Sequence, residues 1–287
     1  MIPNFVEIVK GKLGYIVKGQ TGKWYGVKPP VRQEGDITTF SRTSRSRLRE
    51  TLAMAHLKRG GRLFGVTFTI PSPTQADILS PCKVRLIWSD FSQHIFPRTF
   101  PHSSLIWRIE LQERGQAHWH CVFYCSDDDA LSRNVDLSIA FDLVCFEVCS
   151  VWRALVYNRV NTENWSDKTH FGFADNGVDV KPLTSSAIVG YVCDHGSKQK
   201  QAQLGWVGRQ WGVIGRKNLS FEGEAVVSVP LEHHKKAARQ FRRLQEHLRR
   251  DGKYTGVRVT AAANVSRSIF GKDAERLVKC YELPFNS

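Results

Sequence analysis

Two histidines separated by one residue, His118 and His120, follow a carboxylate, Glu110, within one short segment. Successive side chains of a strand point to opposite faces, so both imidazoles share a face if the segment is extended. Two imidazoles and one carboxylate leave coordination positions open for water or a phosphate oxygen, which suits Mn²⁺ or Mg²⁺ acting as a Lewis acid. The pattern predicts a catalytic metal site; the alternative is two unrelated histidines on a strand.

A hairpin is the element that would position these groups. Residues 104–112 and 117–124 have the composition of strands, and the short connection between them contains Gly115. Such a hairpin can set Glu110 opposite the histidine pair.

A second group of chemically capable residues lies in the segment from residue 184 to 201, which the pattern predicts to be a helix. Tyr191, Asp194, His195 and Lys198 follow the spacing i, i+3, i+4 and i+7, so they share one helix face. A tyrosine beside a lysine and near a divalent ion is a suitable phosphodiester nucleophile. Taken separately, Tyr191 also fits a half-buried aromatic and Lys198 a surface lysine.

Four segments of this chain resemble motifs of one enzyme superfamily. They are residues 63–73 (LFGVTFTIPSP), 108–120 (RIELQERGQAHWH), 190–198 (GYVCDHGSK) and 208–216 (GRQWGVIGR). Together they are similar to the HUH endonucleases of rolling-circle replication, specifically the replication initiators of single-stranded DNA phages and related plasmids and elements. The tyrosine follows the histidines here, as in the initiator branch.

The resemblance implies a role for each matched residue and a fold. His118 and His120 would bind the metal with Glu110 as third ligand, Tyr191 would be the nucleophile, and Lys198 would help to position phosphate or metal. The implied fold is a five-stranded antiparallel sheet with the histidines on a central strand and helices around it. Some relatives carry a second tyrosine where His195 stands, and others a lysine where Asp194 stands.

The element order of the chain also predicts an α+β fold. Apolar periodicity and capping residues indicate a strand over residues 62–70, helices over 43–57 and 137–156, and a helix that begins at Pro81 after the cap residue Ser80. With the hairpin, the order is strand, helix, strand, strand, helix. We predict three parts: N-terminal hairpins and a basic helix over 1–60, the endonuclease domain over 61–220, and a basic helical extension over 221–287.

The charge of the chain indicates a polyanionic partner. The sequence has 287 residues and a formal net charge of +14, which is typical of a protein that binds phosphates. The expected partners are single-stranded or extruded origin DNA, together with a host helicase and polymerase. Candidate DNA-contacting arginines are Arg42, Arg45, Arg47 and Arg114.

The seven cysteines favour a reducing compartment. They are odd in number, form no Cys-x-x-Cys pair and mostly fall in apolar runs. Cys145 and Cys149, one helical turn apart, are better explained by packing than by metal binding because no second pair has matching spacing. The first residues lack a signal peptide's apolar core and no segment has the composition of a membrane span, so we expect the cytoplasm of a bacterial host.

The function predicted from these features is that of an initiator that nicks and rejoins single-stranded origin DNA through a 5′-phosphotyrosine intermediate. Two alternatives remain. A DNA-binding repressor or packaging protein without chemistry would explain the charge alone. A cupin-like metal oxidoreductase would explain His-x-His with a carboxylate, but requires neither Tyr191 nor the positive charge.

Overall fold

The computed structural model describes residues 5–11, 15–20, 40, 42–71, 78–111, 116–132, 137–163, 165–183, 209–250, 267–269 and 271–282. The chain forms two compact units. The larger comprises Gly35–Leu48 and His56–Ser220, and the smaller comprises Met1–Glu34, Arg49–Ala55 and Phe221–Ser287. Each unit is described by itself.

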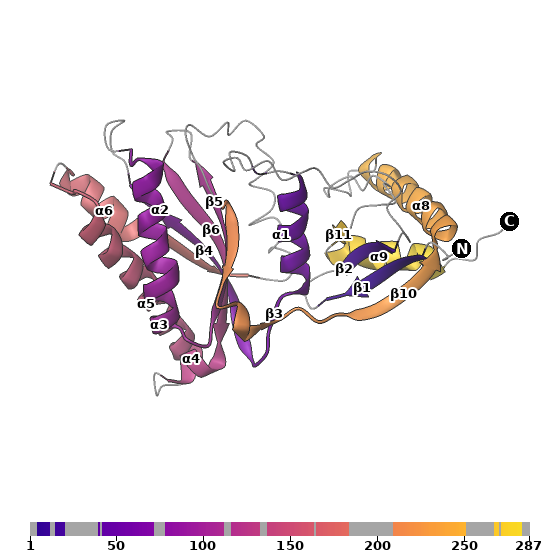
Figure 1. Ribbon diagram of the computed structural model, residues 1–287, viewed down its shortest axis with the longest axis horizontal. Helices are drawn as coiled ribbons and strands as arrows, with labels where there is room; N and C mark the ends of the chain where they lie inside the picture. Colours follow the sequence, from indigo (N-terminus) through magenta and orange to yellow (C-terminus); the bar gives the residue numbers. More distant parts are fainter. Residues whose placement is uncertain are drawn as a thin grey trace. The chain divides into compact units, whose positions relative to one another are not determined.

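The larger unit is built on a five-stranded antiparallel sheet with the strand order β7-β4-β6-β5-β8 (Figure 1). The strands are β4 (Gly61–Thr69), β5 (Ser104–Leu111), β6 (Ala117–Ser126), β7 (Val178–Pro182) and β8 (Trp211–Ile214). The strand with both histidines, β6, is the middle strand of the sheet. The predicted α+β class and the five-stranded antiparallel sheet are therefore confirmed.

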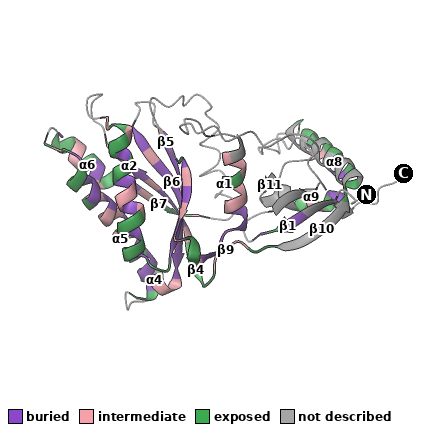
Figure 2. Cartoon of the chain, in the orientation of Figure 1, coloured by how far each residue is buried: buried purple, intermediate pink, exposed green. Residues whose placement is uncertain are grey.

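Side-chain alternation divides the sheet into two faces. On β6, Trp119, Cys121 and Phe123 point to one face and belong to the apolar core, whereas His118 and His120 point to the other. Strands β5 and β6 are buried along almost their whole length, as Figure 2 shows in purple.

Helices cover the apolar face of the sheet. They are α2 (Pro81–Asp90), the π-helical turn η2 (Phe91–Ile95), α3 (Phe96–Thr99), α5 (Leu137–Arg159) and α6 (Asp167–Asn176). As predicted, the Ser80 side chain caps α2 by accepting a hydrogen bond from the amide of Lys83 at 3.3 Å, with Pro81 in the first turn. Trp152 of α5 ties this helix to the sheet, because its Nε1 donates to the Thr69 carbonyl at 3.0 Å.

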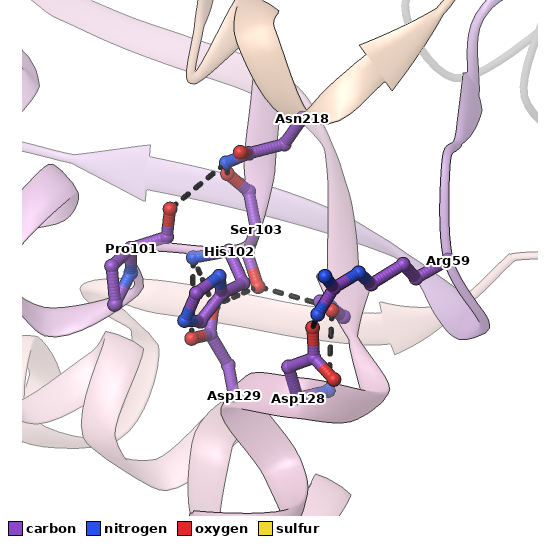
Figure 3. A network of polar contacts seen from close by, with 8 residues as sticks. Arg59, Pro101, His102, Ser103, Asp128, Asp129 and Asn218 are labelled. Carbon is purple, nitrogen blue, oxygen red and sulfur yellow. Dashed lines mark hydrogen bonds and ion pairs between the residues drawn. The ribbon is translucent and has the colours of Figure 1, made fainter.

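A buried polar network joins the residues just before β5 to the end of β6 and to the short helix α4 (Asp127–Leu131) (Figure 3). Asp129, 2% exposed, accepts from the Ser103 hydroxyl at 2.5 Å and from the His102 amide at 3.2 Å. The amide of Ser126 donates to the Ser103 hydroxyl oxygen at 3.0 Å. Asn218 adds hydrogen bonds to the carbonyls of Pro101 and Ser103. The network holds the two site-bearing strands together at this end of the sheet.

Helix α1 (Arg42–Met54) is shorter than its sequence pattern predicts. Residues His56 and Leu57 were expected in the helix, but form strand β3 and pair with β9 (Leu219–Ser220). The partner strand is more than 160 residues away in the chain, so a local pattern does not reveal the pairing. Between β8 and β9, Gly215 has a φ of 67° and opens the 3-10 turn Arg216–Asn218.

The smaller unit contains a second antiparallel sheet, with the order β10-β1-β2-β11. Its strands are β1 (Phe5–Lys10), β2 (Tyr15–Gln20), β10 (Glu224–Pro230) and β11 (Arg267–Ile269), and its helices are α8 (Leu231–Arg250) and α9 (Gly271–Glu282). Because β1 pairs with β10, residues near the two ends of the chain share one unit. Among the described residues, no helix combines the length and apolar character that crossing a membrane requires.

Candidate metal centre

The register of the β5–β6 hairpin brings the predicted ligands together. Glu110 of β5 lies directly opposite His118 of β6, and Arg108 lies opposite His120. Directly opposed residues of antiparallel strands project from the same face of the sheet. All four side chains therefore lie on the face opposite the aromatic core.

The three predicted ligands form a tight cluster. His120 Nε2 lies 3.1 Å from Glu110 Oε2 and 2.8 Å from His118 Nε2. The two imidazole rings are almost perpendicular, at 89°, and the 2.8 Å between their Nε2 atoms brings both nitrogens to one region. The ligand atoms of this triad, Glu110, His118 and His120, all lie within 4.8 Å of one another. The predicted set is thus brought together, and it could hold a metal ion.

The spacing of the triad fits one shared ion. Metal bonds from imidazole nitrogen and carboxylate oxygen are about 2.0–2.2 Å long, so adjacent ligand atoms around one ion stand roughly 3 Å apart. The separations of 3.1 and 2.8 Å match this value. Two nitrogens and one oxygen leave further coordination positions open on such an ion. Of the three ligands, His118 is half-buried, whereas Glu110 and His120 are buried.

The surroundings of Glu110 favour the charged form that a ligand needs. Burial by itself raises the pKa of this carboxyl group. The hydrogen bond with His120 and the positive charges around it outweigh burial, so the pKa lies below its usual value. Glu110 is therefore a carboxylate at neutral pH and can bind a cation without first losing a proton.

Arg108 is a neighbour of the triad that the residue pattern did not single out. It is 4% exposed, and its guanidinium carbon lies 4.6 Å from the centre of the Phe40 ring. Strand alternation would have indicated Arg108, because it stands two residues before Glu110 and shares its face in a strand. On the other side of β6, Thr67 and Thr69 of β4 lie opposite His120 and His118, so they share this face of the sheet.

The remaining predicted site residues are placed only in part. Tyr191 and Lys198, as well as Asp194, His195 and Arg114, lie outside the described residues. Arg42, Arg45 and Arg47 belong to α1, where Arg45 is half-buried and Arg47 exposed, and the side chain of Arg42 is not described.

The cysteine pair Cys145 and Cys149 behaves as a pair of packing residues. Cys145 and Cys149 pack against the core of the larger unit as partly buried side chains. Burial, Cys149 and Asp142 raise the pKa of Cys145 to about 12, so its thiol keeps its proton at neutral pH. Among the described residues, the group of three or more potential ligands close enough to hold a metal is the triad and does not include these cysteines, which agrees with the packing interpretation.

Comparison with known proteins yields no relative for this chain: no family model, no curated protein and no solved structure matches it. The function is therefore inferred from the chemistry of the triad and from the sequence motifs.

Proposed function

We propose that the protein is a metal-dependent replication initiator that nicks and rejoins single-stranded DNA at a rolling-circle origin. The observation that carries this proposal is the triad: a carboxylate and two imidazoles converge on one face of adjacent strands, with spacing suited to a single divalent ion. Bound Mn²⁺ or Mg²⁺ would supply a positive charge that stabilises the scissile phosphate during attack.

Tyr191 is the nucleophile of the proposed reaction. Its phenol oxygen forms a bond to phosphorus while the bond from phosphorus to the 3′ oxygen breaks; the phenol gives up a proton and the departing 3′ oxygen receives one. One phosphate ester replaces another, so the 5′-phosphotyrosine retains the energy needed to rejoin the strand. Lys198 stabilises the extra negative charge at this phosphate.

The charge of the chain supports a DNA substrate. The formal charge of +14 favours a polyanionic substrate such as DNA. Glu110 and His120 are buried, so the scissile phosphate would have to enter the site on a strand that is not enclosed in a duplex. Arg45 and Arg47 remain candidates for backbone contacts. The 3′ hydroxyl that the nick releases would prime a host polymerase, and a host helicase would separate the strands.

The test is the formation of a covalent protein–DNA adduct. The full-length protein is incubated with Mn²⁺ and a library of end-labelled single-stranded oligonucleotides, and products are separated on a denaturing gel. We expect a shifted band that EDTA abolishes and that disappears in Tyr191→Phe. Tyr157→Phe is the matched control, because Tyr157 is a surface tyrosine, 38% exposed, of α5 on the helical side of the larger unit.

Two outcomes would contradict the proposal. A band that persists in Tyr191→Phe would place the nucleophile elsewhere. Tight DNA binding with no adduct under any metal condition would favour the non-catalytic repressor or packaging protein, which the positive charge also fits. The described strands of the larger unit form an open sheet with β7 and β8 at its edges, so the cupin-like oxidoreductase, a two-sheet jelly roll, has no support in them.

A further inference from the structure

Helix α8 of the smaller unit concentrates the positive charge of the chain. Its 20 residues include seven Lys and Arg against two Glu, a formal charge of +5 out of the +14 of the whole protein. Charge of one sign that is gathered on one element indicates a partner of the opposite sign. The triad belongs to the larger unit, so α8 is a separate candidate surface.

Three exposed cations of α8 form a straight row. Lys236, Arg243 and Arg250 are exposed and follow one another at intervals of seven residues. Seven residues are almost two turns of an α-helix, so the three side chains share one line that drifts by only about 20° per step. At a rise of 1.5 Å per residue, the row is about 21 Å long. Arg239 is exposed beside the row, and Glu246 is exposed at its edge.

The apolar side of α8 is buried within the smaller unit. Ala237 is 0% exposed and Leu244 is half-buried, and both lie roughly 100° around the helix from the row. The helix contacts α9 and the strands β1 and β10. An interfacial membrane helix inserts its apolar side into lipid, but this side of α8 is occupied by protein. The described exposed residues of α8, shown in green in Figure 2, are all charged residues or histidines.

Duplex DNA is the polyanion that a straight row of cations fits best. It is a stiff rod with one phosphate charge per about 1.7 Å of axis, so about 12 phosphate charges stand along a stretch of 21 Å. Proteins that hold single strands, by contrast, also offer aromatic side chains on which the bases stack. None of the described exposed residues of α8 is Phe, Tyr or Trp. The row is therefore suited to phosphates alone.

We propose that α8 binds the phosphate backbone of double-stranded DNA through Lys236, Arg243 and Arg250. The inference deepens the proposed function and rests on it for the identity of the duplex: an unpaired origin strand continues into duplex DNA, and α8 holds that duplex. Contacts to phosphates position a protein on DNA without reading the base sequence. Each contact releases condensed counterions, so the binding is strongly salt-dependent.

The test measures how the affinity for duplex DNA depends on salt. The full-length protein, in EDTA to remove divalent ions, is titrated into a fluorescently labelled duplex of about 30 base pairs, and anisotropy gives the affinity between about 50 and 200 mM salt. The row variant combines Lys236→Gln, Arg243→Gln and Arg250→Gln, because glutamine removes the charge and is a good helix former. We expect the slope of log affinity against log salt to become less steep by about 3 in this variant, since each phosphate contact contributes about 0.9.

A control variant separates the row from the total charge of the protein. Lys83→Gln, Arg98→Gln and Lys168→Gln together remove three exposed cations from α2, α3 and α6 of the larger unit. The two variants have the same net charge, so a general loss of electrostatic attraction would weaken both equally. We expect the salt slope of the control variant to stay unchanged. Equal loss in both variants, with unchanged circular dichroism, would overturn the proposal.

Single variants keep the test decisive if the row variant loses helical signal in circular dichroism. Lys236→Gln, Arg243→Gln and Arg250→Gln should then each make the slope less steep by about 1. Lys83→Gln, which also removes one exposed cation, should leave it unchanged. Slopes that are the same in all four single variants would refute the assignment of phosphate contacts to the row.

The kind of partner is distinguished with the same variants. A single-stranded oligonucleotide of the same length should bind the row variant and the control variant with equal affinity. A row variant that loses single-strand binding as strongly as duplex binding would refute the duplex assignment. If the row variant instead lost binding to phosphatidylserine vesicles while its duplex binding stayed unchanged, the row would be a membrane surface and the proposal would be overturned.

Failure of this proposal is distinguishable from failure of the nicking reaction. The binding assay contains no divalent ion, so it uses neither the triad nor Tyr191. Weaker duplex binding in the row variant, with no covalent DNA adduct in wild type, would support the role of α8 and contradict the nickase. A DNA adduct in wild type, with equal duplex binding in the row and control variants, would do the reverse.

Discussion

Replacing Asp129 by alanine should destabilise the larger unit by about 3 kcal/mol. The Asp129 carboxylate accepts hydrogen bonds from the Ser103 hydroxyl at 2.5 Å and from the His102 amide at 3.2 Å (Figure 3). Hydrogen bonds to charged groups contribute roughly 1.5–3 kcal/mol each, so two lost bonds amount to roughly 3–6 kcal/mol. Removing a buried carboxylate also removes its desolvation cost, which places the expected value near the lower limit.

The neighbouring residue provides a matched control. Asp128 lies in the same helix turn, and its ion pair with Arg59, although 2.6 Å long, is exposed, with side chains 32% and 74% accessible. Exposed pairs of this kind contribute about 0–1 kcal/mol. Asp128→Ala removes the same charge from the start of α4 while leaving the buried network intact. We therefore expect a difference of about 2 kcal/mol or more between the two variants.

Urea denaturation followed by tryptophan fluorescence measures this difference. Seven of the eight tryptophans lie between residues 88 and 211, so the signal reports mainly the larger unit. The free energy of unfolding is compared at equal m-values. If Asp129→Ala lies within about 1 kcal/mol of Asp128→Ala, the buried network contributes no more than a surface ion pair, and the reasoning from burial is wrong.

Three further predictions concern Glu110, the packing of Trp107 and the metal. The folded-state pKa of Glu110 is lowered, so its ionised form stabilises the protein above pH 4.5, and this stability is lost as the pH falls through the folded pKa. Urea titrations in EDTA should therefore show that the difference in unfolding free energy between wild type and Glu110→Gln shrinks below pH 4.5. A difference that stays constant with pH would contradict the lowered pKa. In Gly212→Ala, the new Cβ would lie 2.9 Å from Trp107 Nε1, so the indole must shift. We expect the free energy of unfolding, measured by thermal denaturation, to fall by about 1–3 kcal/mol. An unchanged Tm would show that Trp107 moves aside without cost. The affinity for Mn²⁺, measured by calorimetry, should weaken at least about 100-fold in His120→Ala. It should stay unchanged in His94→Ala, because His94 is an exposed histidine of the π turn. Equal affinities in the two variants would exclude the triad as the metal site.

Much of the triad's arrangement follows from local rules. Strand alternation places His118 and His120 on one face, and the short connection containing Gly115 predicts the hairpin that carries Glu110. The cap at Ser80 and the apolar spacing in α5 are equally local, and the structure confirms both. The role of Tyr191 stays a prediction, because this residue lies outside the described residues.

Other features could not be predicted because they depend on contacts between distant segments. Strand β7 has only five residues, and its place beside β4 is decided by pairing rather than by its own pattern. The strand formed by His56 and Leu57 exists only because Leu219 and Ser220 return to it. Arg108 became a neighbour of the triad through the same register that aligned Glu110.

Which side chains share a face follows from local sequence, because alternation and helical periodicity are properties of neighbouring residues. The pairing of β1 with β10, the place of β7 beside β4 and the stacking of Trp88 on Trp119 depend instead on contacts between distant segments. The physical reason is that register and long-range pairing are selected by the burial of whole faces at once. A one-residue shift would turn every side chain of a strand to the other face, and no short segment contains the information that excludes it.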